Sequence, residues 1–469
     1  MTVEYDLIVI GGSRAGIDAA ITAAHLNARV ALIESQPQLG YGVYTSSLTQ
    51  IGRVAKQVQE AAQFGSHTET SLVDWKEAMR WSREVVSTCS EQHSPAILAS
   101  LGIDVIDGVG EFCRRPYLGF VVNNRRLRAR GYLIATGFRS VIPKIAGLQT
   151  AGYLTPETWQ QEFPEQLPTS LVVIGNGGIA IELAQSLARL NCEVTLVVST
   201  SHILPDEDLE AATLIQAQLE AEGVRVLTES LVTQVRNIDG KKWVQAGNQA
   251  LETDEIMLAI EQQPNLEALN LEGVKVEFNA DGIKLNQKLQ TTNFRIYACG
   301  FRQDYLARYE ANIAVKNILF LPIFKVDDRG IPASVFSDPQ LARVGLTEAQ
   351  ARQRYGKDVM VARQYFKTLD KAQILGETTG FCKIVGRQNG EILGAVIVGQ
   401  EAVELIGAMA FCVREKLKIK AIANLPHTSP TLSEIMQQTA IEWQRQIRRH
   451  KRLNDFWEWF FSWRRNWSK

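Results

Sequence analysis

Two short, mostly apolar runs near the start of the chain flank a glycine-rich turn. The first run covers residues 5–10, and the second covers 28–33 and ends just before Glu34 and Ser35. Runs of this length are typical of parallel strands buried on both faces. The turn between them opens a segment with helical spacing, and its small residues are Gly11, Gly12, Ser13 and Gly16. Amides at such a helix N-terminus can hold a pyrophosphate, and an acid at the next strand tip can bind ribose, so the pattern predicts a dinucleotide-binding unit.

The same pattern recurs in the middle of the chain. An apolar run at 170–174 precedes a second turn, with Gly175, Gly177 and Gly178. Gly11 and Glu34 are 23 positions apart, as are Gly175 and Val198, so the second unit carries valine where the first carries its acid. An acid there would favour NAD and a nearby arginine would favour NADP. Neither is present at the strand tip, unless the side chain of His202 or Arg189 reaches the nucleotide. The preference for NADH or NADPH therefore stays open.

Two further strands end at glycines in the first half and the later part of the chain. One leads to Ala135, Thr136 and Gly137, and the other leads to Gly300. The two glycine turns and these two strand ends, in this order and spacing, resemble the class I pyridine nucleotide–disulfide oxidoreductases. This is the group of lipoamide dehydrogenase, glutathione reductase and mercuric reductase. The resemblance continues through 336–351, 380–387, 392–399 and 430–434, which are similar to the dimerisation domain of that family.

The resemblance implies an α/β fold with two Rossmann-like dinucleotide-binding domains and a C-terminal α+β dimerisation domain. We expect FAD on residues 1–147 and 270–325, NAD(P)H on 148–269, a homodimer formed by 326–444, and a separate tail at 445–469. Glu34 would bind the adenosine ribose of FAD, and Ala135, Thr136, Gly137 and Gly300 would lie along the flavin nucleotide.

The resemblance also assigns Glu182 to an acid that forms an ion pair beside the flavin. The lysine that pairs with it in the family is replaced by Ile51 or Gly52. Arg53 and Lys56 are the nearest bases, and either pairs with Glu182 or is solvated.

The catalytic positions of the family are the places where this chain departs from it. Val43 and Leu48 stand on the two redox cysteine positions, and neither side chain can supply the thiolate that disulfide exchange needs. Ser429 stands on the histidine position, although Pro430, Thr431 and Glu434 remain. His427 either reaches into the site or is a surface or capping histidine. Phe301 replaces the aspartate that binds the ribityl chain of FAD.

Composition narrows the functional classes. A chain of 469 residues suggests about three domains, and a net charge of −1 argues against a nucleic-acid partner. The six cysteines include no close pair, which predicts neither a disulfide framework nor a metal site. The N-terminal residues do not read as a secretory signal, so we expect a cytoplasmic protein.

The last 25 residues, 445–469, have a different pattern and are called the tail. Its aromatic residues fall on one helical face with basic residues on both sides; they are Phe456, Trp459, Phe460, Trp463 and Trp467. This pattern favours binding to a membrane surface or to another protein. The alternative is a helix packed on its own body or on the partner subunit, and the apolar face is too short to span a bilayer.

Together these features predict an FAD-dependent NAD(P)H oxidoreductase that is not a disulfide reductase. Its flavin would pass electrons to a small acceptor such as a quinone, with Val43 and Leu48 as an apolar wall. The alternative is a non-catalytic or sensing nucleotide-binding dimer that docks a partner or membrane through the tail. A third reading is a pyridine nucleotide transhydrogenase.

Overall fold

The computed structural model describes residues 3–33, 41–67, 73–161, 164–279, 282–301, 306–448 and 451–467. The chain divides into two compact units, each assembled from separate segments. The first comprises Met1–Gly175, Arg189–Cys192 and Val232–Asp327, and the second comprises Asn176–Ala188, Glu193–Leu231 and Asp328–Lys469. The division falls within the second glycine turn, and the three domains expected from the sequence stay a prediction.

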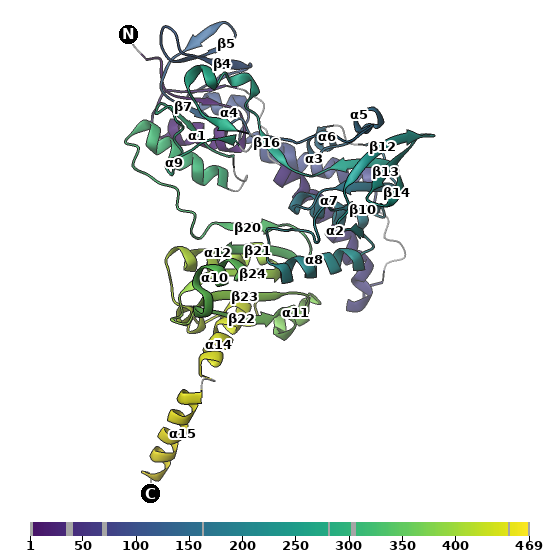
Figure 1. Cartoon of the computed structure of the whole chain (residues 1–469), viewed down its shortest axis with the longest axis vertical. Helices are drawn as coiled ribbons and strands as arrows, with labels where there is room; N and C mark the ends of the chain where they lie inside the picture. Colours follow the sequence, from purple (N-terminus) through teal and green to yellow (C-terminus); the bar gives the residue numbers. More distant parts are fainter. Residues whose placement is uncertain are drawn as a thin grey trace. The chain divides into compact units, whose positions relative to one another are not determined.

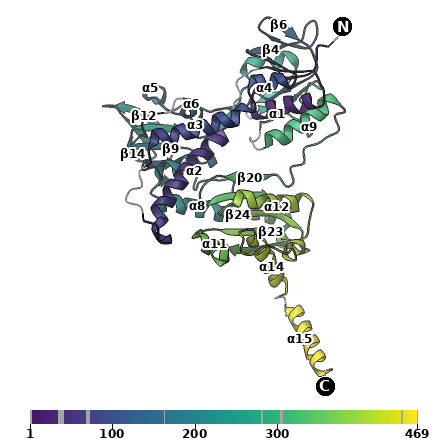
Figure 2. The same cartoon turned by 180° about the vertical axis from the view of Figure 1, so that it is seen from behind.

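A five-stranded parallel sheet forms the centre of the first unit. Its order is β19 (Ile296–Ala298), β7 (Ala129–Ile134), β1 (Tyr5–Ile10), β2 (Val30–Ile33), β3 (Ile103–Ile106). Leu7 and Val9 pack against α1 (Arg14–His25) and α9 (Ala307–Leu319), which lie side by side in Figures 1 and 2. Ile8 and Ile10 face a second cluster. Because both faces are covered, β1 reads as a nearly continuous apolar run.

The other elements of the first unit are strands and helices outside this sheet. The antiparallel strands are β4 (Gly110–Cys113), β5 (Gly119–Val122) and β6 (Arg125–Leu127), then β12 (Val232–Ile238), β13 (Lys241–Ala246) and β14 (Gln249–Thr253). Smaller pairs are β8 (Phe138–Ser140) with β16 (Gln262–Pro264), β17 (Phe278–Asn279) with β18 (Gly282–Ile283), and the parallel pair β9 (Ser170–Ile174) with β15 (Glu255–Leu258). The helices are α2 (Tyr41–Glu60), α3 (Trp75–Glu91), α4 (Pro95–Ser100), α5 (Leu148–Ala151) and α6 (Pro156–Gln161).

The second unit contains a five-stranded antiparallel sheet. Its order is β20 (Pro332–Val335), β21 (Gln340–Gly345), β24 (Ile392–Gly399), β23 (Phe381–Arg387), β22 (Val359–Tyr365). The helices that follow in the sequence are α12 (Ala402–Arg414), α13 (Ile419–Ala423), α14 (Glu434–Arg448) and α15 (Lys451–Asn466). Remaining elements are α7 (Gly178–Ala188), β10 (Glu193–Val197), α8 (Leu209–Ala221), β11 (Arg225–Leu227), α10 (Glu348–Tyr355) and α11 (Asp370–Leu375).

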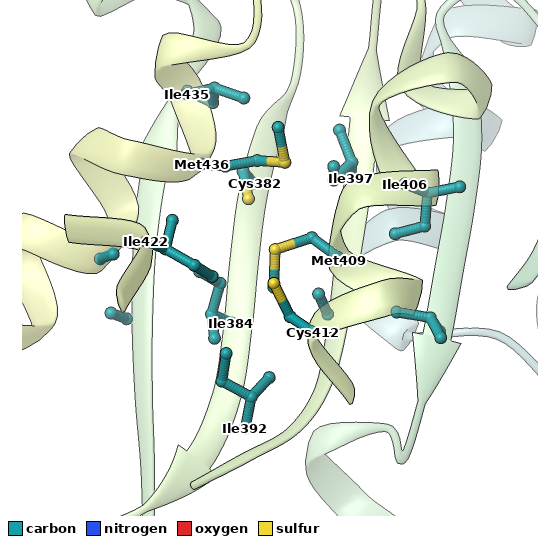
Figure 3. Packing of buried hydrophobic residues seen from close by; sticks show 14 of the residues in the cluster. Cys382, Ile384, Ile392, Ile397, Ile406, Met409, Cys412, Ile422, Ile435 and Met436 are labelled. Carbon is teal, nitrogen blue, oxygen red and sulfur yellow. The ribbon is translucent and has the colours of Figure 1, made fainter. Parts of the chain in front are cut away.

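The core of the second unit lies between this sheet and helices α12, α13 and α14. Figure 3 shows Cys382 and Ile384 of β23 facing Met409 and Cys412 of α12, with Met436 of α14 beside them. This apolar core with helices packed on an antiparallel sheet is the α+β arrangement predicted for the C-terminal region.

Candidate active site

The first glycine turn leaves no room for a side chain at Gly11 or Gly16. Gly11 has a φ of +107°, and a Cβ there would lie 2.3 Å from the carbonyl oxygen of Ala135. A Cβ on Gly16 would lie 2.1 Å from the carbonyl oxygen of Gly11. The amide of Gly11 donates to Ile33 at 3.0 Å, and that of Ala135 donates to Ile10 at 2.7 Å. The turn is thus fixed at the carboxyl ends of three neighbouring strands, where open parallel sheets bind their ligands.

Ser13 has a structural role that the motif alone does not show. It is the N-cap of α1, with extended backbone angles, and its Oγ accepts from the amide of Gly16 at 3.4 Å. Serine is a preferred N-cap residue, so its presence in place of the usual middle glycine is compatible with a helix N-terminus that binds phosphate.

The turn after β7 is held by a residue that the sequence analysis missed. Thr136 Oγ1 donates to the carbonyl oxygen of Asn265 at 2.6 Å, and Asn265 Nδ2 donates to the carbonyl oxygen of Thr136 at 3.2 Å. The backbone amide of Asn265 also donates to the carbonyl oxygen of Gly137, which has a φ of +68°. The only local signal for Asn265 is its place directly after β16.

The turn after β19 is held by a buried acid. Gly300 has a φ of +74°, a Cβ there would lie 2.6 Å from Ala15 Cβ, and its amide donates to Glu310 Oε2 at 2.8 Å. Glu310 is 1% exposed. The ring of Phe301 packs edge-on against Phe138, with centroids 6.0 Å apart, so an aromatic contact takes the place of the expected aspartate.

These turns fit the nucleotide part of FAD. The backbone of residues 11–16 allows close approach, α1 presents its N-terminus, and the neighbouring turns contain Gly137 and Gly300 at positive φ. Phe301 supplies no carboxylate for the ribityl chain. Glu34 and Ser35, expected at the adenosine ribose, lie outside the described residues.

Helix α2 places Val43 and Leu48 in different surroundings. Leu48 is 0% exposed, whereas Val43 is partly exposed. The expectation that both side chains form an apolar wall for an acceptor is therefore wrong for Leu48, which contacts protein instead. The reason is that α2 packs against α3.

Polar groups are buried along the same helix. The hydroxyl of Tyr44 accepts from Trp159 Nε1 at 2.8 Å, and burial raises the pKa of Tyr44 above its ordinary value. Ser47 and Ser82 join α2 to α3 through a hydroxyl–hydroxyl hydrogen bond. These contacts fix the rotation of α2 and hence which of its residues face outward.

The second glycine turn is more open than the first. A Cβ on Gly177 would meet nothing within 4 Å, and one on Gly178 would lie 3.3 Å from Val335. Val198, at the end of β10, is 0% exposed and donates its amide to Leu227 at 2.8 Å. His202 donates its Nδ1 proton to the carbonyl oxygen of Ile203 at 2.8 Å, and Arg189 is buried.

Glu182 on α7 is buried and bound to backbone. Its Oε1 accepts from the amide of Phe336 at 2.8 Å, and the side chain lies beside Gly178. Arg53 and Lys56 are both half-buried on α2. Their pairing with Glu182 stays a prediction.

The residues around Ser429 do not form a proton-transfer pair. Ser429 is exposed, and His427 donates its Nδ1 proton to the carbonyl oxygen of Leu425 at 3.0 Å. Glu434 Oε2 accepts from the amide of Thr431 at 2.8 Å, which satisfies a backbone donor at the start of α14. Glu434 therefore stabilises the helix start, and the contact shown for His427 is a local backbone one.

No metal site accompanies these residues. Across the described ranges, no group of three or more histidine, cysteine and acidic side chains could hold a metal ion.

Comparison with known proteins agrees with this geometry. Residues 5–305 match the model for pyridine nucleotide-disulphide oxidoreductase, and residues 331–440 match that of its dimerisation domain, which supports a homodimer. Mercuric reductase of Staphylococcus aureus is 30% identical over 461 residues, covering 95% of this chain and 83% of that protein. Dihydrolipoyl dehydrogenase of Bacillus subtilis is 30% identical over 452 residues, covering 93% and 98%.

A solved structure extends the likeness to three dimensions. The HOCl-induced flavoprotein disulfide reductase RclA from Escherichia coli aligns with a TM-score of 0.82 and 26% identity, covering 93% of this chain and 99% of that one. The predicted fold class, two Rossmann-type domains and a dimerisation domain, is confirmed. The chain belongs to the pyridine nucleotide-disulphide oxidoreductase family, whose members bind FAD and use NAD(P)H.

Proposed function

We propose that this protein is an NAD(P)H oxidoreductase that passes electrons to a non-disulfide acceptor such as a quinone. The observation that carries the proposal is the absence of sulfur from α2. Val43 and Leu48 stand where the family resemblance places the redox cysteines, and the sequence of Tyr41–Glu60 contains no cysteine at all.

The six cysteines offer no substitute pair. Four are buried: Cys192, Cys299, Cys382 and Cys412. Burial raises the pKa of the Cys299, Cys382 and Cys412 thiols, which disfavours the nucleophilic thiolate. Cys89 and Cys113 are far apart in sequence, on α3 and β4. Disulfide exchange therefore has no reacting group in the predicted position.

Quinone reduction makes smaller demands on the protein. One hydride from NAD(P)H and one proton from solvent convert a quinone to a quinol and leave NAD(P)⁺. Bound FAD would supply the chemistry that accepts the hydride and releases the electrons. The turns at Gly11, Gly137 and Gly300 would hold the cofactor, and the half-exposed Val43 would offer apolar surface to the acceptor. Ser429 need not shuttle a proton, because the quinol oxygens can take protons from water.

The test is an anaerobic titration of the purified dimer. We expect a yellow protein whose flavin band bleaches with NADH or NADPH and returns when a water-soluble benzoquinone is added. Lipoamide, glutathione disulfide and Hg(II) should leave it bleached, whereas dihydrolipoyl dehydrogenase of Bacillus subtilis serves as the control with lipoamide. Turnover of a disulfide by this chain would overturn the proposal.

Phe301 favours a second candidate, a non-catalytic or sensing dimer. An aromatic contact with Phe138 occupies the position from which a carboxylate would hold the ribityl chain. A colourless protein, or a flavin that neither nucleotide reduces, would support this candidate. Rapid hydride exchange between NADPH and NAD⁺ without a quinone would instead support a transhydrogenase.

A further inference from the structure

Helix α15 exposes a row of aromatic rings. Trp459, Trp463 and Trp467 recur at intervals of four residues, with ring centroids 6.5 Å and 4.9 Å apart along the row. They are 61%, 44% and 79% exposed, and Phe461 is 49% exposed. Trp443 on the preceding helix, by contrast, is 0% exposed and belongs to the core. Aromatic surface of this extent at a helix end indicates an interaction site.

The tail also carries a charge opposite to that of the remaining chain. Residues 445–469 contain eight lysines and arginines against two acids, a net charge of +6. The whole chain carries −1, so the other 444 residues carry −7. Five of the basic residues precede the tryptophan row, the pair Arg464 and Arg465 lies between Trp463 and Trp467, and Lys469 follows the row. This concentration of charge favours an anionic partner.

Helical spacing separates the acidic residue Glu458 from the aromatic row. Glu458 and Trp467 are nine residues apart, which at about 100° per residue places them on opposite sides of the helix. Arg465 follows Glu458 by seven residues and falls on the same polar side. On this wheel Glu458 and Arg465 lie opposite Trp467, the last ring of the tryptophan row.

We propose that α15 docks on the surface of an anionic lipid bilayer. Tryptophan rings are favoured at the headgroup level, where arginine and lysine can meet lipid phosphates. The 16-residue helix is about 24 Å long, short of the roughly 30 Å hydrocarbon core. None of the helices within the described residues has the length and hydropathy of a membrane span. A second copy is a poorer occupant, because two tails of +6 repel each other.

The proposal goes beyond the electron acceptor and does not depend on it. A docked enzyme would meet quinones dissolved in the lipid phase, whereas a water-soluble quinone would reach docked and free enzyme alike. Membrane binding and flavin chemistry can therefore be measured separately.

The test is flotation of the full-length dimer with two kinds of vesicle. One is phosphatidylcholine alone, and in the other about a third of the lipid is phosphatidylglycerol. We expect at least tenfold more binding to the anionic vesicles, a blue shift of tryptophan emission on binding, and release at about 0.5 M salt. Equal binding to both vesicles, or none to either, would overturn the proposal.

Substitutions separate the contributions of rings and charges. The triple variant W459S/W463S/W467S should bind at least tenfold less, and R464Q/R465Q should lose about fivefold for each cation removed. Trp81→Ser is the matched control, because Trp81 is also exposed, at 43%, but lies on α3. Glu458→Gln should not weaken binding.

Two further measurements exclude other occupants and misfolding. The triple variant should keep its flavin content, its dimeric mass in sedimentation and its turnover with a water-soluble quinone. A change in the mass of the assembly caused by the tryptophan substitutions would show that the tail binds a second copy of the chain. Saturable binding of the tail to a protein but not to vesicles would likewise overturn the proposal. If the unaltered protein does not reduce a water-soluble quinone, the proposed function is wrong, but the proposal that α15 binds an anionic bilayer is unaffected.

Discussion

Val43 and Leu48 occupy positions that act as a pair in the family, yet only one of them is available to a ligand. Leu48 is fully buried by protein, and Val43 is half-exposed on the same helix. Both side chains are apolar, so the type of residue does not show which of the two is buried. The difference arises from the packing of α2 on α3, including the contact of Ser47 with Ser82.

Alanine at each position should separate a structural from a functional role. Leu48→Ala leaves a cavity and should lower the free energy of unfolding by about 2–5 kcal/mol. Val43→Ala should cost less than about 1 kcal/mol but raise the KM for a quinone. Denaturant unfolding and quinone kinetics on both variants check this, and a larger stability loss at Val43 would contradict it.

Cys382 makes the stability of the second unit sensitive to alkaline pH. Burial raises the pKa of its thiol from 9.0 to about 12 in the core shown in Figure 3. Above pH 9 the unfolded thiol loses its proton while the folded one keeps it. The unfolded state then binds fewer protons, so this contribution is complete below pH 9 and is lost as the pH rises towards 12.

The prediction is a difference in slope between two proteins. From pH 9 upward the free energy of unfolding should fall more steeply in the native chain than in Cys382→Ala, by up to about 1.4 kcal/mol per pH unit. Unfolding in urea at a series of pH values measures both slopes. Buried tyrosines contribute equally to the two, so parallel curves would show that Cys382 has no such role.

Sequence motifs identify residues whose function depends on local geometry. Gly11 and Gly16 are both marked by the strand–turn–helix pattern. A side chain on Gly16 would clash within the turn, with the carbonyl oxygen of Gly11, whereas one on Gly11 would clash with Ala135, which is distant in sequence. Asn265 contacts Thr136 across 129 positions and Glu310 contacts Gly300 across ten, and neither residue belongs to a glycine-turn motif.

At the scale of elements, a buried lysine joins α8 to the antiparallel sheet. Lys383 on β23 is 4% exposed, and its Nζ lies 2.8 Å from both Asp208 and Glu210. Asp208 is also the N-cap of α8. Arg363 contacts Glu210 as well, and Arg343 Nε lies 2.5 Å from Glu207. The start of α8 is therefore held by cations from three strands.

Removing the charge of Lys383 should lower the free energy of unfolding. Lys383→Met leaves the buried carboxylate of Asp208 without its cation, whereas Glu210 keeps its contact with Arg363. We expect a loss of about 3–5 kcal/mol in the free energy of unfolding. Lys284→Met is the control, because Lys284 and Glu277 form a pair with side chains 71% and 63% exposed, and its loss should leave the free energy of unfolding nearly unchanged. Similar midpoints for both variants in denaturant would refute the assignment.

Helices and strands could be predicted where the spacing of their own apolar residues marks them. The apolar runs at 5–10 and 170–174 form β1 and β9, and the spacing of the tail forms α15. The pairing of Val198 with Leu227 could not be read from the sequence, because the two residues are distant along the chain. Motif spacing therefore finds the strand tip but does not show which side chain is exposed there.

At the scale of the whole molecule, the family could be recognised from the order of the glycine turns, but the reaction could not. Fold and cofactor depend on backbone geometry that the turns retain. The positions at which the family resemblance places the reacting cysteines and histidine carry Val43, Leu48 and Ser429 instead. Relatives at 30% identity include a mercuric reductase and a dihydrolipoyl dehydrogenase, so overall similarity does not identify the acceptor.

A thiol-blocking experiment addresses the whole chain at once. If electrons pass to the acceptor without sulfur, N-ethylmaleimide should leave NAD(P)H–quinone turnover unchanged, even when it is added after anaerobic reduction by NADPH. Adducts should form on Cys89 and Cys113 alone, because the other four cysteines are buried. Mass spectrometry of the treated protein and its initial rates provide the two readouts. A relative that works through thiols should lose activity under the same treatment, whereas inactivation of this chain would mean that one of its own cysteines takes part.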